Sequence, residues 1–201
     1  MNEPISESND SSRPEFWDIR FASGKTPWDF HGVPETLNLF LKASPPGKVL
    51  IPGCGTGYEV RAFHQAGWEV AAIDFSSAAV EQARIHLGEL AHCVILGDFF
   101  KHDVGKRCFD LIYERTFLCA LPPPLWRAYA DRMSQLLRPG ASLVGIFLYG
   151  EEPEPPPYPL SETKAEELFE TNFSLVRSIP VEDSLPLFAG QERWQEWKLK
   201  T

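Results

Sequence analysis

Apolar residues recur along the chain with two different spacings. Short runs that are almost wholly apolar predict strands, and stretches with an apolar residue at every third or fourth position predict amphipathic helices. Serine or proline at the start and glycine at the end mark several of these helices. The predicted strands cover 48–52, 68–74, 91–97, 108–114, 141–149, 173–180 and 193–200, and the predicted helices cover 14–24, 33–43, 58–67, 76–90, 123–140 and 161–171.

The order of these elements predicts the fold class. Between 48 and 149 strands and helices alternate, which is typical of a parallel sheet with helices on both faces. The last two strands follow each other without a helix, so they are expected to run antiparallel. We therefore expect an α/β, Rossmann-like doubly wound sheet of about seven strands, mostly parallel with an antiparallel last strand.

Length and charge limit the domain organisation and the partners. With 201 residues, the chain is expected to form one domain over 13–201, preceded by a polar, disordered arm over 1–12. A net charge of -9 argues against nucleic acid and anionic membranes, which attract clustered Lys and Arg. The sequence contains neither a long apolar run nor a signal-like N-terminus, so a cytoplasmic location without membrane contact is expected.

The four cysteines lie in or beside strand-like runs. They form no CxxC pair and have no histidine at ligand spacing, so buried free thiols are favoured over disulfides or zinc ligands. No metal site is expected. The cysteines are Cys54, Cys93, Cys108 and Cys119.

The stretch VLIPGCGTGYEV (49–60) leads from a predicted strand through three glycines into a helix. Such a turn lets a ligand approach the backbone at a helix N-terminus, where N–H groups are unpaired. Gly53, Gly55 and Gly57 stand at alternate positions, a spacing that differs from the dinucleotide fingerprint. A tight turn without any ligand is the alternative.

Acidic residues follow the next two predicted strands. Asp74 stands where a carboxylate accepts hydrogen bonds from both hydroxyls of a ribose, although it could instead cap the next helix. Asp98 could accept from an adenine amine while Phe99 or Phe100 packs on the ring, or it could be a simple loop residue. Together these residues favour an adenosine that carries a small reactive tail.

Five segments, in this order and spacing, resemble a known family. The segments are FWDIRFASGKTPWD (16–29), VLIPGCGTG (49–57), FDLIYERTFLCALPP (109–123), YADRMSQLLRPG (129–140) and PPPYPLS (155–161). Through them the chain is similar to the class I S-adenosylmethionine-dependent methyltransferases and, within them, to the thiopurine S-methyltransferase family, close to its thiol and halide methyltransferase branch. The resemblance covers about residues 14 to 199.

The resemblance implies S-adenosylmethionine as cofactor and assigns residues to it. Three aromatic residues match positions that enclose the methionine part in this family, and a sulfonium is attracted to aromatic faces. These aromatics could alternatively only hold the N-terminal helix against the sheet. The expected cofactor-binding residues are Trp17, Phe21, Trp28, Gly53, Gly55, Gly57, Asp74, Phe75, Asp98 and Phe99.

The resemblance also implies residues for the acceptor. Arg115 matches an arginine of the thiopurine branch, whereas the halide branch usually has an uncharged residue there, so the sequence combines features of two branches. Arg115 is the expected catalytic residue, and Trp28, Arg115 and Tyr158 are the expected substrate contacts. Glu114 stands where Asp is common. A salt bridge from Arg115 to Glu114 or another carboxylate is the alternative role.

The expected reaction is methyl transfer to small soft nucleophiles, with thiols as the first expectation and halides as the second, and the protein is expected to be a monomer. A thiolate needs alignment more than a general base, which agrees with the absence of a histidine paired to an acid among the five histidines. The alternatives are an O- or N-methyltransferase of small metabolites and a non-catalytic protein that binds S-adenosylmethionine.

Overall fold

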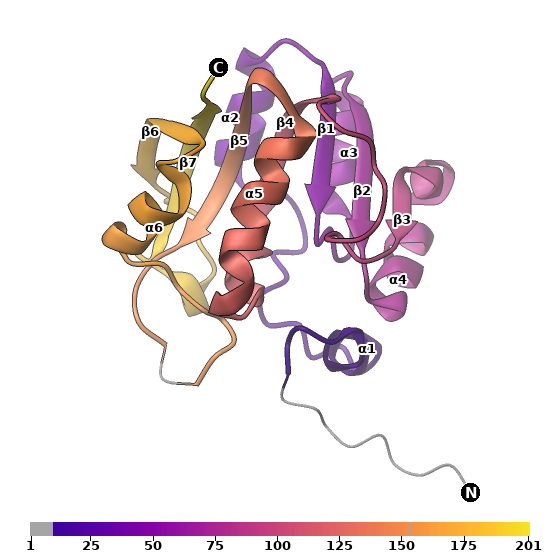
Figure 1. The fold of residues 1–201 in the computed structure, drawn as a ribbon. Helices are drawn as coiled ribbons and strands as arrows, with labels where there is room; N and C mark the ends of the chain where they lie inside the picture. The colour runs from indigo at the N-terminus through magenta and orange to yellow at the C-terminus, as the bar shows by residue number, and fades with distance from the viewer. Residues whose placement is uncertain (1–9, 153) are drawn as a thin grey trace, which may run out of the picture.

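A seven-stranded sheet forms the centre of the computed structural model, which describes residues 10–152 and 154–201 (Figure 1). The strand order is β3-β2-β1-β4-β5-β7-β6, with β1 to β5 parallel, β7 antiparallel to β5 and β6 antiparallel to β7. This confirms the expected fold class and the antiparallel end of the sheet. The strands are β1 Lys48–Pro52, β2 Glu69–Asp74, β3 Val94–Leu96, β4 Phe109–Arg115, β5 Leu137–Leu148, β6 Phe173–Pro180 and β7 Glu192–Leu199.

Helices pack on both faces of the sheet, as the alternating pattern predicts. α5 and α6 cover one face, and α2, α3 and α4 cover the other. None of the helices in the described parts of the chain is both long enough and apolar enough to cross a membrane. The α-helices are α1 Pro14–Ala22, α2 Glu35–Ala43, α3 Tyr58–Gln65, α4 Ser77–Leu87, α5 Trp126–Leu136 and α6 Glu162–Phe169, and the 3₁₀ helices are η1 Gly88–Cys93, η2 Leu118–Ala120, η3 Pro123–Leu125 and η4 Pro186–Phe188.

Two hydrophobic clusters, one on each face, hold the helices to the sheet. Tyr129 of α5 and Phe169 of α6 are fully buried in the first, and Leu37 of α2 and Phe63 of α3 are fully buried in the second. Because the central strands are covered on both sides, their sequences are continuous apolar runs rather than alternating ones. The four cysteines are free thiols, three of them buried.

Several expected boundaries were wrong, and two of them have a clear physical reason. The helix that we expected to end at Gly140 ends at Leu136, and β5 begins at once, with Leu137 paired to Phe109. Pro139 explains this difference, because proline cannot continue a helix and disfavours helical geometry in the residue before it. The strand expected over 91–97 is only Val94–Leu96, because the 3₁₀ helix η1 takes up the residues before it.

Residues 10–13, which precede α1, make specific contacts with it. Residues 1–9 of the expected arm lie outside the described residues, but Ser11 is buried and its carbonyl accepts a hydrogen bond from the Trp17 indole at 2.8 Å. α1 itself lies near the carboxyl ends of β1 and β2 (Figure 1). The fold therefore brings the N-terminal helix and the loops that follow the parallel strands to the same edge of the sheet.

Candidate functional site

A cavity of about 470 Å³ lies at this edge, where β1, β2, β3 and β4 end. Its volume is in the range of sites for small molecules and cofactors. The structure brings together in its lining most of the residues that the sequence analysis selected. These are Trp17, Phe21, Trp28, Gly53, Gly55, Asp74, Phe75, Asp98, Phe99 and Arg115.

The glycine loop forms the floor of the cavity. Gly53 has φ of 59°, and a side chain there would collide with the ring of Phe117, so this position needs glycine for two reasons. Gly57 does not line the cavity. It precedes α3 with φ of 81°, and a Cβ atom there would lie 3.1 Å from Leu87 of α4, so this glycine serves helix packing.

Asp74, at the end of β2, is the most buried carboxylate of the predicted set. Its Oδ2 accepts from the backbone N–H of Gly55 at 3.0 Å and its Oδ1 from that of Ser76 at 2.9 Å. Burial raises the pKa of Asp74 to about 6 despite these hydrogen bonds. The cap of α4 is Ser76, whose hydroxyl accepts from the N–H of Ala79, so Asp74 does not have the capping role considered as its alternative.

Asp98 lies in the loop after β3 and is about one-third exposed. It accepts from the N–H of Phe100 at 2.8 Å and forms an ion pair of the same length with Lys101. Phe99 beside it is buried and packs edge-to-face on Phe117, with ring centroids 5.3 Å apart. The loop thus presents the carboxylate of Asp98 next to the aromatic surface of Phe99, although one carboxylate oxygen already accepts from the N–H of Phe100 in the same loop.

Three aromatic side chains from α1 and the loop after it form one wall. Trp28 packs edge-to-face on Trp17 and on Phe21, with ring centroids 5.4 and 6.1 Å apart. Each of them borders the cavity. A cation in the cavity would therefore be close to several ring systems, an arrangement that stabilises positive charge.

Asp18, which the sequence analysis missed, holds this wall in place. Its Oδ1 accepts from the hydroxyl of Ser76 at 2.6 Å and from the N–H of Ala78 at 3.0 Å, at the N-terminus of α4. Gln82 of α4 donates in return to the carbonyl of Phe21 at 2.7 Å. An acid at a helix N-terminus is favourable, but here it belongs to another helix, which no local pattern indicates.

Arg115, the last residue of β4, forms a buried ion pair with Glu59 of α3. Its Nη1 lies 3.5 Å from Oε1 of Glu59, and the two side chains are 9% and 11% exposed. The guanidinium also lies over the ring of Phe30, 4.7 Å from its centroid. The partner is therefore not Glu114 but another carboxylate, and Glu59 is a second residue that the sequence analysis missed.

Glu114 points to the opposite face of the sheet from Arg115. Its Oε1 accepts from the N–H groups of Phe117 and Leu118, both at 2.9 Å, and its Oε2 from the hydroxyl of Tyr129 at 2.7 Å. Burial raises the pKa of Glu114 to about 7. This carboxyl group supports the turn after β4, in which Thr116 has φ of 56°.

A second cavity, of about 460 Å³, adjoins the first on the other side of Trp17 and Trp28. Thr116 and Ala120 also border both cavities. The remaining lining comes from α1 and the loop after it, from η2, from the loop after β5 and from the segment before β7. It consists mainly of Phe16, Pro27, Pro156, Pro157, Leu187 and Phe188, with Arg20, Lys25, Glu152 and Glu154 as charged members.

Tyr158 is not brought to either cavity. Its N–H donates to the carbonyl of Cys119 at 2.7 Å, and its ring packs against the hydrophobic cluster under α5 and α6. Its neighbours Pro156 and Pro157 border the second cavity in its place. The expected substrate residue Tyr158 is therefore absent from the linings of both cavities.

Acidic side chains outnumber basic ones around the first cavity. Arg115 and Lys101 provide positive charge, and Asp29, Glu59, Asp74 and Asp98 provide negative charge. Such an excess of negative charge favours a ligand with a positive charge.

Comparison with known proteins gives the chain's relatives. The family model described as thiopurine S-methyltransferase matches residues 12–199. A probable thiol methyltransferase 2 of Arabidopsis thaliana is 32% identical over 191 residues, which are 90% of this chain and 84% of the relative. Thiocyanate methyltransferase 1 of the same plant is 30% identical over 190 residues, with coverage of 90% and 83%.

Among solved structures, the fold is similar to that of 1,6-didemethyltoxoflavin-N1-methyltransferase from Burkholderia thailandensis, with bound 1,6-didemethyltoxoflavin and S-adenosylhomocysteine. The TM-score is 0.76 at 19% identity, and the match covers 100% of this chain and 94% of the other. At this identity, the likeness concerns the fold.

The buried Glu114 generates a prediction for stability. Because its pKa is about 7 in the folded protein and 4.5 ordinarily, folding takes up a proton between these values. The stabilising contribution is thus present below about pH 4.5 and is lost as the pH rises through about 7. Glu114→Gln should remove this component, on the order of a few kcal/mol across that window. Urea unfolding of the parent protein and the variant at several pH values measures this contribution to the free energy of unfolding. The same pH dependence of this free energy in both proteins would contradict the prediction.

Proposed function

The chain belongs to the thiopurine S-methyltransferase family, and from this premise we propose that it transfers the methyl group of S-adenosylmethionine to small thiols. The observation that carries the proposal is the pairing of two adjoining cavities, of which one suits a cationic adenosine derivative and the other an apolar acceptor. The residues that separate them are aromatic or small.

The residues of the first cavity fit the cofactor. Asp74 and Asp98, at the ends of neighbouring strands, can accept hydrogen bonds from a nucleoside, and Phe99 offers an apolar surface to its base. Trp17 and Trp28 offer aromatic faces to a sulfonium. When bound, S-adenosylmethionine supplies a methyl group on a positively charged sulfur, which is a good leaving group.

The strand order supports a proposed position for each part of the cofactor. β3, β2, β1 and β4 are successive neighbours in the sheet, so their carboxyl ends follow one another along its edge. With the nucleoside at β3 and β2, the glycine loop after β1 and Arg115 of β4 remain for the amino-acid tail. We infer that the guanidinium of Arg115 binds the tail carboxylate, a role different from the acceptor contact expected from the sequence.

The second cavity is the proposed acceptor site. Its lining is largely apolar, from Phe16, Pro157 and Phe188 among others, so it suits a neutral or weakly polar thiol better than a small hydrated anion. Trp17 and Trp28 stand between the cavities, and burial of the reacting atoms beside them would exclude water. Alignment of nucleophile, methyl group and sulfur is then the main catalytic contribution of the protein.

A panel of acceptors tests the proposed reaction. With S-adenosylmethionine, the protein should methylate aryl and alkyl thiols with a higher kcat/KM than iodide, because the acceptor cavity is apolar. Phenols and amines serve as controls for O- and N-methylation. Faster turnover of iodide, or of a phenol or an amine, would contradict the thiol assignment, and no turnover of any acceptor would favour a binding protein.

Asp74 should make cofactor binding depend on pH. Its ionised form accepts from the ribose hydroxyls, so the affinity for S-adenosylhomocysteine should fall as the pH drops through about 6. Asp74→Asn should weaken binding about tenfold at neutral pH and flatten this dependence. Titration calorimetry from about pH 5 to pH 8 measures both effects, with melting temperature as a check on folding. A variant with an undiminished pH dependence would exclude Asp74 as its source.

The variant Arg115→Ala distinguishes between the two candidate roles of the Arg115 side chain, which are binding of the tail carboxylate and binding of the acceptor. If its guanidinium binds the tail carboxylate, Arg115→Ala should weaken binding of S-adenosylhomocysteine about tenfold or more but leave 5′-methylthioadenosine, which lacks the tail, nearly unchanged. If it binds the acceptor instead, both nucleosides bind normally and kcat/KM for ionised thiols falls. Calorimetry and steady-state kinetics on the same variant decide between these results.

A further inference from the structure

The carboxylate of Glu59 forms an ion pair with Arg115, and it is also placed where it can accept a hydrogen bond from a ligand in the first cavity. It is the second residue of α3, directly after the glycine loop, and it lines the first cavity. Only 11% of its side chain is exposed. A carboxylate at this depth loses most of its hydration, so its surroundings must compensate the charge.

The ion pair with Arg115 compensates the buried charge of Glu59 only in part. In the parts of the chain that the structure describes, the 3.5 Å contact with Glu59 is the only hydrogen bond of the Arg115 side chain. A guanidinium carries five N–H donors, and most of these remain unpaired in a side chain that is 9% exposed. Unpaired charged donors in a buried position are costly, so the geometry favours a ligand that completes both partners.

The other polar groups at this end are already engaged or uncharged. Asp29 accepts from the hydroxyl of Thr56 at 3.1 Å and from the N–H of His31 at 2.7 Å. Burial raises the pKa values of Cys54 and Tyr113 well above their usual range, so both remain neutral. Glu59 is thus the carboxylate at this end whose one side-chain partner among the described residues is Arg115, so it can accept from a further positively charged donor.

We propose that Glu59 is a cofactor-binding residue that accepts a hydrogen bond from the ammonium group of the cofactor's amino-acid tail. The inference rests on the proposed function, because it takes the ligand to be an adenosine derivative with such a tail. An α-amino acid carries its ammonium and carboxylate groups on one carbon atom, and the adjacent side chains of Glu59 and Arg115 match these two charges. The completed site contains two positive and two negative charges and is neutral overall.

Three ligands isolate this interaction in Glu59→Gln, which keeps the shape of the side chain. All three ligands are uncharged at sulfur: S-adenosylhomocysteine has both tail charges, decarboxylated S-adenosylhomocysteine has the ammonium group alone, and 5′-methylthioadenosine has neither. Calorimetry should give about tenfold to a hundredfold weaker binding of the first two and a change of less than about twofold for the third. Loss with the decarboxylated ligand assigns the effect to the ammonium group.

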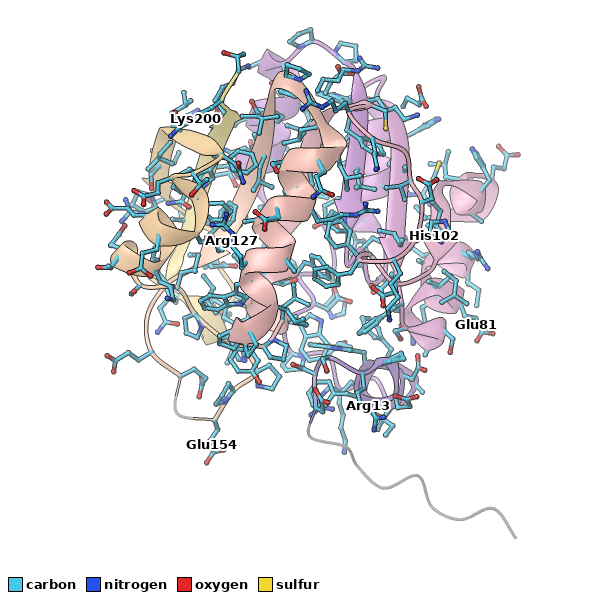
Figure 2. The ribbon with its side chains drawn as sticks, viewed as in Figure 1. Arg13, Glu81, His102, Arg127, Glu154 and Lys200 are labelled. Carbon is cyan, nitrogen blue, oxygen red and sulfur yellow. The ribbon has the colours of Figure 1, made fainter. Side chains whose placement is uncertain are left out.

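Glu81→Gln is the matched control, because it makes the same change of charge on an exposed helix position. Figure 2 shows Glu81 on the outer side of α4, away from the sheet. This variant should bind all three ligands like the parent protein. The melting temperature of each ligand-free variant shows whether it folds.

Each contrary result has a separate meaning. Equal losses for all three ligands in Glu59→Gln would overturn the inference, because the residue would then support only the general shape of the site. Unchanged binding of all three would overturn it as well. If the parent protein bound neither S-adenosylhomocysteine nor 5′-methylthioadenosine, the proposed function itself would fail.

Discussion

The site depends on the two hydrogen bonds that the buried carboxylate of Asp74 accepts. One comes from Gly55 in the loop after β1, and the other comes from Ser76 at the start of α4. The loops after two neighbouring parallel strands are thus tied to a single side chain. Ser76 in turn donates to Asp18, so α1 is connected to the same point. The aromatic wall that α1 carries therefore has a fixed position relative to the glycine loop.

This arrangement has an electrostatic consequence. Asp74 loses hydration on burial, which raises its pKa to about 6, and the carboxylates of Asp29, Glu59 and Asp98 border the same cavity. A cationic ligand relieves the repulsion among these groups, and the nearby indole rings stabilise the same charge. The product of methyl transfer has lost the sulfonium charge, so the carboxylates and indole rings of the proposed cofactor site would attract it less.

Much of the site could be predicted because parallel strands end at the same edge of a sheet. Asp74 and Asp98 follow two such strands, so the strand pattern alone was sufficient to place them together. The Glu59–Arg115 pair joins residues 56 positions apart and depends on how α3 packs beside β4, which no local pattern indicates. The contact of Asp18 with the N-terminus of α4 was missed for the same reason. Tyr158 was misplaced because the sequence does not specify which side of a proline-rich loop its ring faces.

The end of β4 is the place where these constraints meet. Successive residues of a strand point to opposite faces, and here Glu114 reaches Tyr129 of α5 while Arg115 reaches Glu59 of α3. The carboxylate of Glu114 holds the turn after β4, which places Phe117 against Gly53. Because of the same turn, Thr116 and Ala120 border both cavities. The ion pair of Arg115 with Glu59 completes the polar end of the first cavity. A shift of β4 by one residue would exchange these two roles, so the register of β4 between β1 and β5 determines both the proposed acceptor boundary and the proposed tail site.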